Sequence, residues 1–149
     1  MLRTLSGEGA GLQKIEFCLI KRSREMENLL LVVDDWESLD FYEEKLRPYF
    51  QVETAFIAEE AIRTLQERKA ITWVLVDLSL EDCTPQEFLE KLIQKDLFVD
   101  RFFVFILDSE SKLDAAQTKQ FASQLNVFRR PYEFKEVIEL LNKKNSPRL

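Results

Sequence analysis

Three aspartates in this sequence stand directly after short apolar runs, a placement that suits the binding of a metal ion. Asp34 and Asp35 follow the run 29–33, and Asp77 follows the run 73–76. A short run rich in Val and Leu predicts a strand that is buried on both faces of a parallel sheet. Ligands bind where the carboxyl ends of such strands meet, so the three carboxylates converge if the two strands are neighbours. Converging carboxylates repel one another unless a hard cation joins them.

The elements that must position these residues are visible as a repeating pattern. From Leu29 onward, strand-like and helix-like segments alternate five times. We expect strands at 29–33, 51–56, 72–77, 102–107 and 126–128, and helices at 36–46, 58–69, 85–95, 111–125 and 132–142. Such alternation predicts an α/β fold in which a doubly wound, five-stranded parallel sheet carries five helices on its two faces.

Composition excludes several classes of protein. With 149 residues, of which 46% are hydrophobic, the chain can build one core, and a second sizeable domain is not expected. The net charge of −6 argues against nonspecific binding to nucleic acid or to an anionic membrane, because both are polyanions. The two cysteines lack CxxC spacing and the chain has no histidine, so neither a disulfide framework nor a zinc site is expected.

The ends of the chain lie outside the alternating pattern. No apolar stretch reaches the ~20 residues of a membrane span and no signal peptide begins the chain, so we expect a cytoplasmic protein. The three glycines, Gly7, Gly9 and Gly11, lack the spacing of a phosphate-binding loop. We interpret residues 1–27 as a flexible extension or as the product of a mis-assigned start, residues 28–145 as the domain, and residues 146–149 as a tail.

The order and spacing of these motifs resemble the receiver domains of two-component response regulators. The resemblance spans about residues 28–144 and depends on Leu30–Asp35, on Val74–Asp82 and on Arg130–Tyr132, where the family has Lys-Pro-Phe. It implies a flavodoxin-like fold and a bacterial phosphorelay in which the partner is a histidine kinase, a histidine phosphotransfer protein or another signalling protein. It also implies a monomer or weak homodimer with no enzyme activity beyond its own phosphorylation and dephosphorylation.

The resemblance gives each acidic residue a role. Asp77 is expected to accept the phosphoryl group, and Mg²⁺ is expected to be held by Asp35 with Asp34 nearby, by an Asp77 oxygen and by the backbone carbonyl of Ser79. The metal matters because a carboxylate and a phosphoryl donor carry like charge, which Mg²⁺ neutralises. From the residues alone another interpretation stays open, in which Asp34 caps the first helix and Asp35 adds negative charge to its first turn.

Two residues depart from the family pattern on the far side of the same pocket. Asp108 stands where the family has a Thr or Ser that bonds the phosphoryl group, and Arg130 replaces the family's lysine. Two like unit charges ~4 Å apart cost about 4 kcal/mol at an effective dielectric of ~20, so Asp108 opposes an arriving phosphoryl group. We expect either a bidentate ion pair between Asp108 and Arg130 or an Asp108 that turns to solvent. Val127 replaces an aromatic residue that many receivers carry, and the bond between Arg130 and Pro131 is a candidate for the cis isomer.

Three functions therefore stay open. The first is a phosphorylatable single-domain response regulator, which the set Asp34, Asp35 and Asp77 favours. The second is a pseudo-receiver that is not phosphorylated and that binds partners through its fourth helix, fifth strand and fifth helix, which Asp108, Arg130 and Val127 favour. The third is a phosphatase-like hydrolase with an Asp nucleophile, which the absence of an Asp-x-Asp motif weakens.

Overall fold

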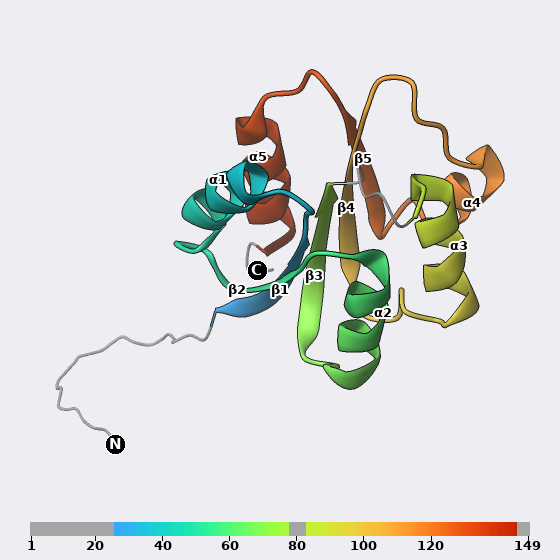
Figure 1. Cartoon of the computed structure of the whole chain (residues 1–149), viewed down its shortest axis with the longest axis horizontal. Helices are drawn as coiled ribbons and strands as arrows, with labels where there is room; N and C mark the ends of the chain where they lie inside the picture. The colour runs from blue at the N-terminus through green and yellow to red at the C-terminus, as the bar shows by residue number, and fades with distance from the viewer. Residues whose placement is uncertain (1–25, 78–82, 146–149) are drawn as a thin grey trace, which may run out of the picture.

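A computed structural model describes residues 26–77 and 83–145 of the chain, so the sequence predictions for Gly7, Gly9, Gly11, Cys18 and Ser79 lie outside the described residues. Strands and helices alternate throughout the described part (Figure 1). They are β1 (Glu27–Val32), α1 (Trp36–Leu46), β2 (Phe50–Ala55), α2 (Ala58–Glu67), β3 (Ile71–Asp77), α3 (Pro85–Gln94), β4 (Phe102–Leu107), α4 (Ala115–Gln120), β5 (Leu125–Arg129) and α5 (Phe134–Asn145). No helix among these residues is both long and apolar enough to cross a membrane.

The sheet has the predicted parallel architecture. Its five strands run in the order β2-β1-β3-β4-β5, and every neighbouring pair is parallel. Helices α1 and α5 cover one face, whereas α2, α3 and α4 cover the other (Figure 1). Because β1 and β3 are neighbours, the acidic residues that follow them lie at one edge of the sheet, as the sequence predicts. The strand order reverses at this point, which is where ligands bind in doubly wound folds.

The buried strands fill two core layers. In β3, Trp73 and Leu75 belong to the layer that contains residues of α1 and α5, and Val74 and Val76 belong to the layer that contains residues of α2 and α3. Successive side chains of a strand point to opposite faces, so Asp77 continues the first series. Its carboxylate therefore lies on the α1 and α5 side of the sheet.

Helix α4 differs most from its prediction. We expected a helix over 111–125, but α4 spans only Ala115–Gln120. It begins late because Asp114 caps it, accepting a hydrogen bond from the backbone N–H of the third helical residue. It ends early because Leu125, predicted as part of the helix, is the first residue of β5 and pairs with Phe103. At Leu125, burial in the sheet thus outweighs helical spacing. The other helices and strands lie within about three residues of their predicted bounds.

A buried arginine fastens the end of the sheet opposite the acidic residues. Arg101 is only 4% exposed. Its guanidinium donates to the backbone carbonyls of Ile71 at 2.8 Å, Leu65 at 2.8 Å, Arg68 at 3.0 Å and Leu97 at 3.3 Å. Burial lowers the pKa of Arg101 below its usual range. This one side chain therefore joins α2, β3 and the segment between α3 and β4.

Candidate functional site

Asp77 ends β3 as a buried carboxylate, and the described residues hold one of its two oxygens. It is 3% exposed. Its Oδ2 atom accepts hydrogen bonds from Arg130 Nη2 and from the Tyr42 hydroxyl, the latter at 3.2 Å. Its Oδ1 atom is buried and has no hydrogen-bond partner within the described part of the chain. A buried carboxylate oxygen without a partner is costly, so Oδ1 marks a position where a cation or a reacting group can bind.

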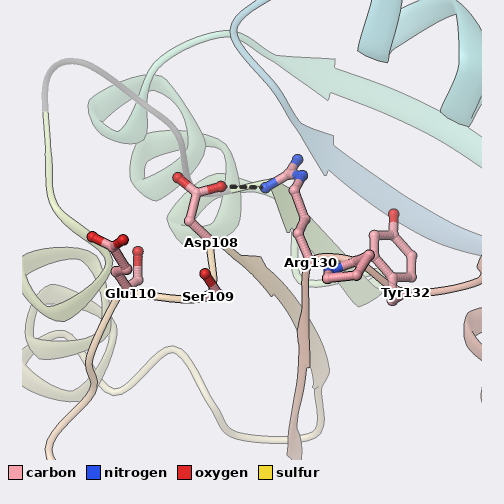
Figure 2. A pocket seen from close by; sticks show the side chains of 7 residues that line it. Asp108, Ser109, Glu110, Arg130 and Tyr132 are labelled. Carbon is pink, nitrogen blue, oxygen red and sulfur yellow. Dashed lines mark hydrogen bonds and ion pairs between the residues drawn. The ribbon is translucent and has the colours of Figure 1, made fainter.

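Arg130 joins the two carboxylates of the pocket. Its Nη2 atom binds Asp77. Its Nη1 atom donates to Asp108 Oδ1 at 3.1 Å (Figure 2). The predicted ion pair between Asp108 and Arg130 is therefore present, but the expectation of a bidentate pair is wrong, because the guanidinium divides its two ends between two carboxylates. Partial burial pulls the pKa of Arg130 down, but the hydrogen bond and charge of Asp77 outweigh it and raise the pKa above its usual value.

Two tyrosine hydroxyls extend this network on the other side of Asp77. The Tyr42 and Tyr132 hydroxyl oxygens lie 2.8 Å apart. Burial, together with the negative charge of Asp77, raises the pKa of Tyr42 far above its usual value, and burial also raises the pKa of Tyr132. From its spacing in the sequence, Tyr42 is expected only on the apolar face of the helix at 36–46. The signal that could have revealed it is its hydroxyl, which needs a partner when the ring is buried.

The acidic pair after β1 is divided between two environments. Asp35 is exposed and caps α1, since its Oδ1 atom accepts from the backbone N–H of Ser38 at 2.7 Å. This hydrogen bond lowers the pKa of Asp35. The interpretation that gave the cap to Asp34 is therefore wrong by one residue. Asp34 is half-buried and lies directly after β1, whose neighbour in the sheet is β3.

Asp34, Asp35 and Asp77 are also three of the four residues predicted to hold magnesium. Within 26–77 and 83–145, no group of three or more acidic, cysteine or histidine side chains is placed to hold a metal. Magnesium commonly takes one or two carboxylates and keeps several waters, so it does not need such a group. The Oδ1 atom of Asp77, which is buried and has no partner among the described residues, is available as one carboxylate ligand of such a site. The magnesium site therefore stays a prediction, and its expected ligand Ser79 lies outside the described residues.

An open hollow of about 900 Å³ lies beside Arg130. It is lined by Asp108, Ser109, Glu110, Ser111, Arg130, Pro131 and Tyr132 (Figure 2). Residues 108–111, which line one part of it, are held by Arg129, which donates to the backbone carbonyls of Asp108 and Ser111. The peptide bond between Arg130 and Pro131 is cis. Because Arg130 lines the hollow and also binds Asp77, it lies between the hollow and this buried carboxylate.

Val127, where many receivers carry an aromatic residue, packs partly buried against the core layer under α2 and α3. It also lines a second hollow of about 670 Å³, together with Leu113, Ala115, Thr118, Lys119, Ala122 and Arg129. The surface between α4 and β5 is therefore indented at this position rather than filled by a ring.

Comparison with known proteins identifies the fold. No protein-family model matches the sequence, and no curated protein matches it. Among solved structures, the chemotaxis response regulator CheY4 of Vibrio cholerae is 17% identical, with a TM-score of 0.65 over 80% of this chain and 98% of that chain. A response regulator receiver protein from Pseudomonas putida is also 17% identical, with a TM-score of 0.64 over 81% of this chain and 99% of that chain. A structure named as an adenylate cyclase from Rhodopirellula baltica has a TM-score of 0.64 at 17% identity and covers 80% of this chain and 87% of its own.

These likenesses agree with the topology derived from the sequence. The strand order β2-β1-β3-β4-β5 and the helices on both faces give this chain the fold of response-regulator receiver domains. At such low identities the similarity concerns the fold, and the chemistry of the site has to be argued from this chain's own residues.

Proposed function

We propose that this chain is a receiver-type signalling module that acts by binding another signalling protein while Arg130, rather than a phosphoryl group, is the partner of Asp77. The observation that carries this proposal is the bridge from Asp77 through Arg130 to Asp108. An internal cation gives Asp77 the neutralising partner that Mg²⁺ would otherwise supply. The module itself performs no catalysis, and its signal is the surface that it presents to its partner.

Electrostatics favour this function over reversible phosphorylation. A phosphoryl group on Asp77 Oδ1 would draw negative charge from Oδ2 and so weaken the ion pair with Arg130, and it would also approach the carboxylate of Asp108. Like charges at ~4 Å oppose each other by about 4 kcal/mol at an effective dielectric of ~20. Asp108 is 61% exposed at its side chain, so solvent screens part of this repulsion. The balance still disfavours the phosphorylated form compared with a pocket that has a hydroxyl at position 108.

One observation favours the second candidate, a phosphorylatable response regulator. The Oδ1 atom of Asp77 is buried and has no partner among the described residues, so it is free to attack phosphorus. In that reaction the Oδ1–P bond forms, the bond from phosphorus to the donor's leaving group breaks, and the leaving group departs with its electron pair. Asp34 and Asp35 would help to hold Mg²⁺, which lowers the repulsion between the reacting groups. The donor would be a histidine kinase or a histidine phosphotransfer protein.

A titration with Mg²⁺ and beryllofluoride, a mimic of a phosphoryl group on aspartate, separates the two candidates. Backbone amide NMR spectra are compared for the wild-type chain, D77N, and the double variant D108T/R130K, which restores the hydroxyl and lysine of the family pattern. We expect no Asp77-dependent shifts in the wild type and clear shifts in D108T/R130K. Shifts in the wild type that D77N abolishes would overturn the first proposal in favour of the second.

A further inference from the structure

The hydroxyls of Tyr42 and Tyr132 form a hydrogen-bonded chain that ends on Asp77. We propose that these two tyrosines are positioning residues, which hold the Asp77 carboxylate turned toward Arg130 and so restrain it from taking a ligand on Oδ1. This inference rests on the proposed function, since a restraint on Asp77 has a consequence for signalling only if Asp77 is the signalling residue.

The segment between β5 and α5 contributes two side chains, Arg130 and Tyr132, to the hydrogen-bond network around Asp77. Arg130 reaches Asp77 directly, and Tyr132, two residues further along, reaches it through Tyr42 of α1. The segment is therefore fastened to the end of β3 at two points. A change at Asp77 would be felt at both points, because neither Arg130 nor Tyr42 can leave Oδ2 without releasing part of this segment or of α1.

The direction of the hydrogen bonds follows from what each group can donate. An ionised carboxylate only accepts and a guanidinium only donates, so the Tyr42 proton points to Asp77 Oδ2. Tyr132 then donates its proton to the Tyr42 oxygen. Burial and the charge of Asp77 raise the pKa of Tyr42, so this hydroxyl keeps its proton at neutral pH.

Packing fixes the Tyr42 ring in the required position. Tyr42 is 3% exposed, and its ring lies 5.5 Å from that of Phe41 and 5.7 Å from that of Phe134, measured between centroids. The hydroxyl is therefore delivered to Asp77 by a ring with little freedom to move. Phenylalanine has the same shape without the hydroxyl, so Y42F removes the hydrogen bond and leaves this packing in place.

The charge on Asp77 determines what the hydroxyl chain favours. When a phosphoryl group or beryllofluoride bonds to Oδ1, negative charge moves away from Oδ2, which becomes similar to an ester carbonyl oxygen. Hydrogen bonds to a charged acceptor are stronger than those to a neutral one, so the Tyr42 bond stabilises the free carboxylate more than the liganded form. Removing the hydroxyl should therefore make ligand binding at Oδ1 tighter.

The first test measures ligand affinity in the D108T/R130K background. We expect Y42F to tighten the apparent Kd for beryllofluoride in the presence of Mg²⁺ by about tenfold, the order expected for one hydrogen bond to a charged group. Y132F should have a smaller effect in the same direction, because Tyr132 acts through Tyr42. The matched control is Y49F, at an exposed tyrosine between α1 and β2, which should change nothing. An unchanged or weaker affinity in Y42F would overturn the inference.

The second test needs no ligand. Tyrosine ¹³Cζ chemical shifts report the hydrogen bonding of each hydroxyl, and they are compared between the wild type and D77N. We expect the Tyr42 and Tyr132 signals to move and the Tyr49 signal to stay. Unmoved signals at Tyr42 and Tyr132 would overturn the inference. If D108T/R130K does not bind beryllofluoride but these signals move, the positioning role of the tyrosines stands, and the part of the proposed function that fails is that Asp108 and Arg130 are what keep a ligand from Asp77.

Discussion

Arg130 and Asp77 form an ion pair between unequal environments: the side chain of Arg130 is 36% exposed, whereas that of Asp77 is 4% exposed. Removing the arginine leaves a buried carboxylate without its cation, and such losses cost about 3–5 kcal/mol when both partners are buried. Solvent at Arg130 reduces this figure, so we expect R130A to lower the free energy of unfolding by about 2 kcal/mol. Urea denaturation of R130A and the wild type at neutral pH measures this difference in the free energy of unfolding.

Two comparisons show whether that loss comes from the pair. R47A removes the surface ion pair between Arg47 and Glu43, and it should cost under about 0.5 kcal/mol. The double variant D77N/R130A should be less destabilised than the sum of D77N and R130A, because the uncompensated charge is gone. Additive effects would mean that Arg130 and Asp77 do not interact in solution.

Much of the fold could be predicted from the sequence, because the elements next to the site carry strong local signals. Strands β1, β3 and β4 each contain a continuous apolar run, which burial on both faces of a parallel sheet requires. A polar residue follows each run and marks where the strand ends. Helix α4 was not predicted correctly, because no residue of α4 is buried. Its apolar neighbours Leu113 and Phe121 pack against the core from outside the helix.

The candidate site was predicted in part, because sequence patterns locate strand ends but do not give the direction of individual side chains. Strand ends placed Asp34, Asp35 and Asp77 at one edge, since topology alone determines that convergence. The Tyr42 bond to Asp77 depends on which way one ring of α1 points, and spacing along the sequence carries no such information. The division of Arg130 between two carboxylates likewise depends on the positions of both β4 and β5 relative to β3.

The N-cap of α1 predicts a stability that depends on pH. The hydrogen bond from the Ser38 backbone lowers the pKa of Asp35, so the folded state binds a proton there less readily than the unfolded chain does. The stabilisation is therefore present above the usual value of 3.8 and is lost as the pH falls through the lowered value. We expect D35A to cost about 1 kcal/mol at neutral pH and less under acid conditions.

Denaturation curves of D35A, D35N and the wild type from neutral pH to about pH 2, without added metal, test this expectation. Asparagine caps helices without a charge, so D35N should keep most of its stability and should show a flatter dependence on pH than the wild type. A constant difference between D35A and the wild type over the whole range would contradict an ionised cap.

The buried Arg101 predicts a stability effect at the end of the sheet away from Asp77. R101M keeps much of the apolar stem but leaves the carbonyls of Ile71, Leu65 and Arg68 without their donor. We expect a loss of about 3 kcal/mol in the free energy of unfolding, with R101K intermediate because an ammonium donates from a single point. The Tyr42 and Tyr132 ¹³Cζ signals should stay unchanged, and their movement would show that this end is coupled to the site.

The buried Tyr42 and the partly buried Tyr132 predict that the protein is destabilised in alkali. Burial raises the pKa of Tyr42 and of Tyr132 above the usual value of 10.0, so above pH 10 the unfolded chain loses these protons while the folded protein keeps them. Stability is therefore complete below that pH and falls as the pH rises. We expect the double variant Y42F/Y132F to lose less stability than the wild type between pH 9 and about pH 11.5, as measured by urea denaturation at each pH. Y49F should follow the wild type, because Tyr49 is exposed. Equal slopes for all three proteins would mean that Tyr42 and Tyr132 ionise as readily in the folded state as in the unfolded chain, which is incompatible with a buried hydroxyl chain on Asp77.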